Sequence, residues 1–121
     1  MKVTRIVYAS FAMVAPAILV LAACGASGPK PGTPEASYVD LGCAKCHGAE
    51  REGKRSGPSL VKIEDHWDEE GLMQYLRDPK TFVDANPRLS YMGEQYPIAM
   101  PAFAHTDEQQ LRQLAEFILN S

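Results

Sequence analysis

Two cysteines and a histidine stand close together in the run Cys43-Ala44-Lys45-Cys46-His47, and this cluster limits what the chain can be. The chain has only three cysteines and three histidines, so the odds of meeting the pattern by chance are on the order of one in a thousand. Two cysteines at this spacing cannot staple a domain as a disulfide framework. A zinc site would need further ligands, and His66 and His105 lack the spacing of paired zinc ligands. A thioredoxin-like redox pair would need a βαβ context, which the sequence does not show.

The spacing C-x-x-C-H is the one that c-type haem attachment requires. Two thiols add across the two vinyl groups at one edge of the porphyrin, and the next residue brings its imidazole to the iron. We therefore expect one covalent haem c on Cys43 and Cys46, with His47 as the proximal axial ligand. The haem would also give a large apolar centre to a folded part that is too short for a self-sufficient core.

The second axial ligand must come from elsewhere in the chain. The candidates are Met73, Met92, Met100, His66 and His105. Met100 is preferred, because it stands before Pro101 in a loop ahead of the last expected helix, from which a long thioether can reach back over the haem. Met92 is the serious rival. Met73 is expected to fill the core, and the two histidines are expected on the surface.

The first 23 residues have the layout of an export signal. Lys2 and Arg5 form a positive start, residues 6–23 carry no charge, and Leu21-Ala22-Ala23-Cys24 follows. This box resembles that of bacterial lipoproteins, which implies acylation of Cys24 and attachment to the bacterial cell envelope. The domain would then lie in the periplasm or at the outer face of the cytoplasmic membrane. A plain secretory signal and an uncleaved membrane anchor are the alternatives, and the choice between inner and outer membrane stays open.

Three regions are expected along the chain: a signal peptide over 1–23, a lipidated cysteine with a Gly/Pro/Ser-rich tether over 24–35, and a mono-haem domain over 36–121. The strong patterns in the domain are helical. Helices are expected over 36–46, over 68–78 with Pro79 as terminator, from 87 to 91 or 92, and after Thr106 as N-cap, with Gln109 completing a capping box. The predicted fold class is all-α, with three to five short helices around one haem.

Further motifs follow the cysteine cluster in a fixed order. They are Gly57-Pro58-Ser59-Leu60, Tyr75-Leu76-Arg77-Asp78-Pro79, Met100-Pro101-Ala102-Phe103 and a closing amphipathic helix. With these motifs the chain resembles a class I mono-haem cytochrome c over about residues 35–121. The resemblance implies that the Pro58 carbonyl accepts a hydrogen bond from the His47 ring. It also implies that the first and last helices cross, which would bring together Tyr38, Val39, Leu114 and Phe117. Extra residues relative to the smallest bacterial members are expected within 80–98.

His/Met ligation fills both axial positions of the iron and raises its potential. The chain is therefore expected to transfer electrons and not to be an enzyme. It would act as a carrier between redox partner proteins of a respiratory chain or as a subunit of a respiratory complex. The alternative is a haem enzyme or sensor, peroxidase-like or gas-binding, with a labile distal ligand.

The charge of the chain bears on its partners. The net charge is −3, and it becomes −5 once residues 1–23 are removed with Lys2 and Arg5. Nucleic acid is not expected as a partner, because phosphate contacts need clustered basic residues. A locally basic segment follows the cysteine cluster and holds Lys45, Arg51, Lys54 and Arg55. An acidic run, which reads as a solvated face, lies further on over 64–70. A basic haem rim that meets an acidic partner is the docking hypothesis.

Overall fold

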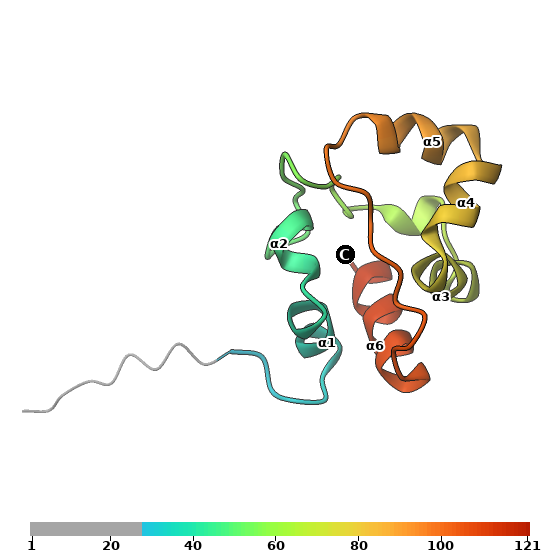
Figure 1. Cartoon of the computed structure of the whole chain (residues 1–121). Helices are drawn as coiled ribbons and strands as arrows, with labels where there is room; N and C mark the ends of the chain where they lie inside the picture. The colour runs from blue at the N-terminus through green and yellow to red at the C-terminus, as the bar shows by residue number, and fades with distance from the viewer. Residues whose placement is uncertain (1–27) are drawn as a thin grey trace, which may run out of the picture.

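The computed structural model describes residues 28–121, and its elements are helices (Figure 1). In chain order they are α1 (Pro34–Asp40), α2 (Cys43–His47), the 3-10 helix η1 (Ile63–Asp65), α3 (Glu69–Arg77), α4 (Pro79–Ala85), α5 (Pro87–Glu94) and α6 (Glu108–Leu119). No strand forms among the described residues, so the all-α class is confirmed, with six α-helices against the three to five of the sequence prediction. The signal segment and Cys24 lie outside the described residues. None of the helices within 28–121 has the length and apolar character needed to cross a membrane.

Gly42 divides the first expected helix into two. Its φ of +80° is left-handed, a conformation that glycine adopts readily and that ends a right-handed helix. α1 begins after Thr33, whose Oγ1 accepts a hydrogen bond from Ala36 N, and it has Pro34 at its first position. The prediction of one helix over 36–46 is therefore wrong, and α2, which contains the cysteine cluster, is a separate element.

Side-chain caps start the three helices in the middle of the chain. Asp68 caps α3, Asp78 caps α4 and Asn86 caps α5, each through an oxygen that accepts a hydrogen bond from a backbone N–H. α3 agrees with the helix expected over 68–78. α4 has no counterpart among the expected helices, because Pro79 also suits the first position of a new helix. The region 80–98, where extra residues were expected, holds most of α4 and all of α5.

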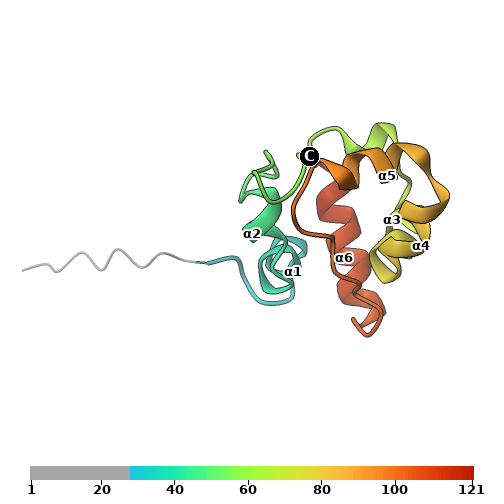
Figure 2. The ribbon, with the colours of Figure 1, turned by 45° about the horizontal axis from the view of Figure 1, so that its top comes forward.

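α6 lies between α1 on one side and α3 on the other, and its apolar face is central to the core (Figures 1 and 2). Its buried residues are Leu111, Leu114, Ala115 and Ile118. The expected crossing of the first and last helices is confirmed, and the rings of Tyr38 and Phe117 lie 5.2 Å apart. Val39 does not join this contact and is 45% exposed. Successive residues of a helix point about 100° apart, so Tyr38 and Val39 cannot both face α6.

A single polar side chain of α6 also holds the start of the domain. Nε2 of Gln113 donates to the Gly32 carbonyl at 3.1 Å, and its Oε1 accepts a hydrogen bond from Ser37 Oγ at 3.4 Å. Ser37 is buried on α1, whereas Gly32 lies in the turn before that helix. Gln113 therefore joins α6 both to α1 and to the segment that leads into it.

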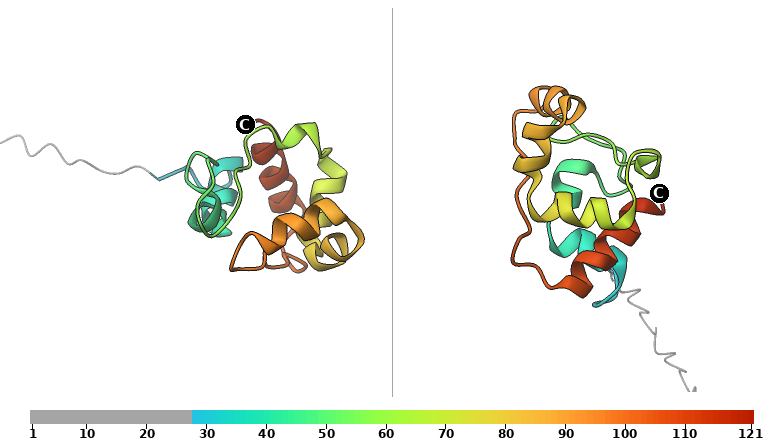
Figure 3. Two further views of the ribbon diagram at one scale, coloured as in Figure 1. Left: turned by 90° about the horizontal axis from the view of Figure 1, so that it is seen from above. Right: turned by 90° about the vertical axis from the view of Figure 1, so that its right-hand side faces the viewer.

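The chain returns from α5 to α6 through a segment without helix, residues 95–107. This segment leaves α5 at one end of the molecule and runs back past α6 to reach the start of α6 at the other end (Figures 1 and 3). Phe103 N donates to the Leu76 carbonyl at 2.8 Å, which attaches the segment to the last turn of α3. Met100 therefore lies in a loop, as expected, and close to a fixed point of that loop.

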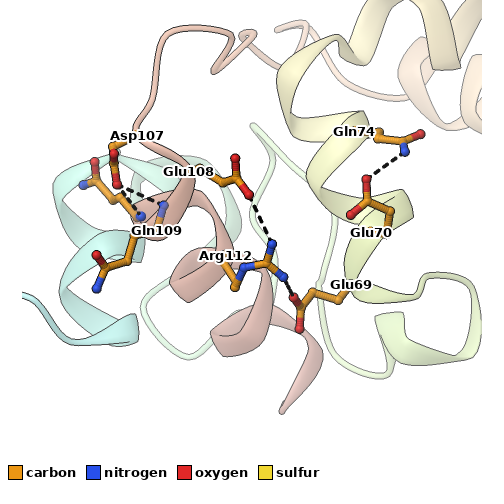
Figure 4. A network of polar contacts seen from close by, with 8 residues as sticks. Glu69, Glu70, Gln74, Asp107, Glu108, Gln109 and Arg112 are labelled. Carbon is orange, nitrogen blue, oxygen red and sulfur yellow. Dashed lines mark hydrogen bonds and ion pairs between the residues drawn. The ribbon is translucent and has the colours of Figure 1, made fainter.

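Asp107 caps α6. Its Oδ1 accepts hydrogen bonds from Gln109 N at 2.9 Å and from Gln110 N at 3.2 Å (Figure 4). The prediction of Thr106 as the N-cap is therefore wrong by one residue. A carboxylate at position 107 accepts from two N–H groups, and its negative charge suits the positive end of the helix dipole.

Candidate functional site

The helices enclose a cavity of about 1070 Å³. Every element from α2 to α6 contributes to its wall, together with the loops before η1 and before α6. Its volume lies slightly above the roughly 300–1,000 Å³ that small-molecule sites occupy, and its wall is mostly apolar. Within the described residues, this cavity is where a large apolar group fits.

α2 places the cysteine cluster on one wall of the cavity. Cys43, Cys46 and His47 all line it, and both cysteines are free thiols. Burial raises the pKa of Cys43 to about 11, with a smaller contribution from the nearby Cys46. No group of three or more His, Cys, Asp or Glu side chains that could hold a metal ion occurs within 28–121.

His47 is oriented by the loop that follows α2. Its Nδ1 lies 2.7 Å from the Pro58 carbonyl oxygen, which can only accept, so Nδ1 bears the proton and donates. In the neutral ring Nε2 then has a free lone pair, which is the form that binds a metal. The hydrogen bond that the resemblance implied is therefore present, and His47 itself is buried, with 8% of its surface exposed.

Two glycines allow close approaches of this loop, Gly57 to α2 and Gly53 to Ser59 within the loop itself. A Cβ on Gly57 would come within 3.0 Å of the Cys46 carbonyl oxygen. A Cβ on Gly53 would meet Ser59 N at 2.5 Å, and Gly53 also has a left-handed φ of +85°. The segment that contains the Pro58 carbonyl is thus held beside α2 by backbone contacts that larger residues would prevent. Gly57 belongs to the motif noted in the sequence, whereas nothing in the sequence pattern singled out Gly53.

The five candidates for the second axial ligand separate in the structure. Met92, Met100 and His66 line the cavity, but Met73 and His105 do not. Met73 is buried in the core, as expected. Met100 packs against the buried core, whereas Met92 lies on α5 with its sulfur 3.7 Å from Arg88 Nη1. Two thioethers, those of Met92 and Met100, therefore line the same cavity as the cysteine cluster.

Aromatic side chains form a second wall that the sequence analysis did not identify. Trp67 and Tyr75 line the cavity with ring centroids 4.9 Å apart, and Phe82 lies 5.9 Å from each of them. Burial raises the pKa of Tyr75, and the nearby Arg88 charge partly opposes this. Trp67 is half-buried, so the interpretation of the run 64–70 as a wholly solvated face is wrong at this residue.

The charged side chains divide between surface and structure. Lys45, Lys54 and Arg55 of the basic segment are exposed, but Arg51 is half-buried with its guanidinium carbon 4.3 Å from the centre of the Phe117 ring. In the acidic run, Glu69 forms an ion pair with Arg112 of α6, which also reaches Glu108, while Glu70 accepts a hydrogen bond from Gln74 (Figure 4). The basic surface therefore has three exposed members and not four.

The comparisons with known proteins agree with this geometry. The family model for cytochrome c matches residues 35–121, which is well over half of the chain and includes the whole cavity. A search of the curated proteins and a search of the solved structures found no match.

Proposed function

The chain belongs to the class I cytochrome c family, and from this premise we propose that it is a lipid-anchored mono-haem carrier of electrons whose iron is held by His47 and Met100. Family membership makes it a haem c protein that transfers electrons, with one covalent haem for a domain of this size. The observation that carries the proposed haem site is that both thiols, the His47 imidazole and Met100 line one and the same cavity.

Each residue of the site has a role in this proposal. Haem c supplies a one-electron couple that cycles between ferrous and ferric iron. Cys43 and Cys46 would hold the group through thioether bonds, and His47 would bind the iron through Nε2, because Nδ1 donates to the Pro58 carbonyl. Met100 would supply the sixth ligand from the loop that Phe103 attaches to α3.

The remaining wall suits electron transfer better than substrate turnover. Buried Leu72 and Leu76 face the cavity beside the aromatic pair Trp67 and Tyr75, so the surroundings of the group are apolar and packed. An apolar shell controls solvent access and raises the potential of a haem. A packed shell also keeps the geometry similar in both oxidation states, which lowers the reorganisation needed for each transfer.

The location and the partners are part of the proposal. We place the haem domain in the periplasm, attached to a membrane of the cell envelope through lipid on Cys24, where redox proteins of a respiratory chain would be its donors and acceptors. The support comes from the sequence, in the uncharged run 6–23 and the lipoprotein-like box that ends at Cys24. The exposed basic residues beside α2 provide a surface for a partner of opposite charge.

Replacing Cys24 with serine should release the haem protein from the membrane fraction or block its processing, because serine cannot form the thioether to lipid. We would fractionate cells, measure the haem absorbance in each fraction and determine the mass of the N-terminal peptide. The wild-type peptide should have the lipid mass on Cys24. A wild-type protein that keeps residues 1–23 and has no lipid mass on Cys24 would instead indicate an uncleaved anchor.

Charge reversal beside α2 tests both electron transfer and the docking hypothesis. We expect the Lys54→Glu/Arg55→Glu variant to be reduced about tenfold more slowly by the native donor at low salt, because steering by charge raises association rates by 10-fold or more. The difference should shrink as salt shortens the Debye length to about 8 Å and below. Stopped-flow mixing with solubilised membranes measures the rate.

The matched control reverses two charges in the acidic run. Glu64→Lys/Glu70→Lys is suitable because both side chains are exposed, whereas Glu69 is ion-paired with Arg112. This variant should be reduced at the wild-type rate or faster. A wild-type rate that does not respond to salt or to either reversal would contradict docking by charge. A wild-type protein that no membrane fraction reduces or oxidises would contradict the carrier itself.

A further inference from the structure

We infer that Arg51 is a positioning residue for His47, which ties the end of α6 to the loop segment that orients the imidazole ring. The inference rests on the proposed function in one respect, the assignment of His47 as the proximal ligand. Arg51 occurs in a run of charged residues that the sequence presents as surface, but the structure gives its side chain and its backbone separate fixed partners.

The side chain of Arg51 is anchored on α6. Its Nη1 donates to the Phe117 carbonyl at 2.5 Å, and the guanidinium stacks on the Phe117 ring at 4.3 Å. A cation at this end of a helix also satisfies the negative end of the helix dipole. Nε of Arg51 is buried and has no hydrogen-bond partner among the described residues. Burying this N–H costs its desolvation free energy, and the other contacts of the side chain must offset that cost.

The backbone of Arg51 adopts a conformation that is rare for a residue with a large side chain. Its φ is +62°, in the left-handed region that glycine occupies without steric cost. Such strain persists only where the surroundings hold it in place, and it often marks a functional position. A glycine would fit this backbone better, so what the arginine adds at this position is its side chain.

The strained backbone holds the segment after Gly57. The Arg51 carbonyl accepts a hydrogen bond from Leu60 N at 2.8 Å and another from Ser59 Oγ at 3.2 Å. These two residues directly follow Pro58, whose carbonyl accepts from His47 Nδ1. The contacts therefore run without a gap from Phe117 on α6 through Arg51 to Ser59 and Leu60, and from there to the acceptor of the His47 ring.

Loss of the Arg51 anchor should weaken the hydrogen bond between His47 and Pro58. A hydrogen bond from Nδ1–H to a carbonyl makes the imidazole a more basic ligand for iron. When this hydrogen bond is weaker, Nε2 donates less electron density to the iron. The ferric state is then less stabilised, and the ferrous state is favoured. We therefore expect two changes: exchange of the His47 Hδ1 proton with solvent that is faster than the loss of stability alone explains, and a raised midpoint potential.

The test uses the full-length protein with its haem, in the reduced state. NMR spectroscopy measures Hδ1 exchange in Arg51→Met, where we expect exchange at least tenfold faster than in wild type. The potential is measured in Arg51→Lys, which keeps the charge but lacks the planar guanidinium, and it should rise. Arg55→Met is the matched control, because it removes the same charge from an exposed arginine of the same loop.

A second control separates positioning from stability. Ala115→Gly weakens α6 at a buried residue outside the cavity wall, and it reports how much exchange follows from lower stability alone. Equal Hδ1 exchange in Arg51→Met and Ala115→Gly at equal unfolding midpoints would overturn the inference. Phe117→Leu, which keeps the carbonyl but removes the ring, should shift exchange in the same direction and replaces Arg51→Met if that variant does not fold.

The outcomes also distinguish the inference from the proposed function. A wild-type protein whose haem iron is not bound by His47 would contradict the proposed function. A wild-type protein with that ligation, together with unchanged exchange and potential in the Arg51 variants, would contradict the role of Arg51 only.

Discussion

Replacing both Cys43 and Cys46 with alanine should leave the chain without covalently bound haem. Wild-type protein should retain one haem per chain after acid extraction, as measured by mass spectrometry, and the double variant should retain none. The variant should also lose its helical fold, measured by circular dichroism. Without haem, part of the cavity would stay empty. An empty volume of only about 200 Å³ would lower the free energy of unfolding by roughly 5 kcal/mol, which equals the whole stability of many small domains.

The matched control is Cys24→Ser, which removes a cysteine outside the cavity-lining cluster. Its haem content per chain should equal that of wild type, because Cys43 and Cys46 both line the cavity and are unchanged. The single variants should differ from the double variant by keeping one thioether bond. A wild-type chain with two free thiols and no haem would contradict the assignment of this site.

Replacing Met100 with alanine should keep the covalent haem but remove the near-infrared band of ferric haem with a sulfur ligand. The midpoint potential should fall by on the order of 100 mV, since axial ligands set haem potentials over a range of roughly 0.8 V. Absorption spectroscopy and a redox titration measure the two effects. Met92→Ala is the matched control, because Met92 lines the same cavity, and it should leave both properties unchanged.

The same pair of variants can overturn the ligand assignment. Loss of the band in Met92→Ala but not in Met100→Ala would place the ligand on α5. Absence of the band from wild-type protein would point to a labile distal position and would favour a peroxidase-like or gas-binding haem protein.

The features predicted correctly from the residue pattern alone are those whose cause lies within a few residues, whereas the crossing of the first and last helices followed from the family resemblance. C-x-x-C-H occupies one short helix, so its three functional side chains reach the same cavity without help from distant residues. α3 is bounded by Asp68 and Asp78, both visible as polar residues at the ends of an apolar pattern. The hydrogen bond between His47 and Pro58 followed from the family resemblance, because both residues stand in matched motifs.

The features that sequence reasoning missed depend on contacts between distant residues, or on residues whose type is compatible with two different local structures. Arg51 looks like a surface charge beside Lys54 and Arg55, and its burial follows from Phe117, which is 66 residues away. Pro79 can both end one helix and start another, so α4 could not be seen from the proline alone. Tyr38 and Val39 are both apolar, and the choice between them depends on the rotation of α1 against α6.

Gln113 determines which part of the domain takes up a mechanical force applied through the N-terminal segment. If the chain is attached to a membrane through its N-terminal segment, a pulling force on that segment acts on the domain at Gly32 and α1. Gln113 of α6 is hydrogen-bonded to both Gly32 and Ser37 of this region. No residue of α1 lines the cavity. Mechanical load would therefore reach the joint between the two terminal helices before it reaches α2 and the wall of the cavity.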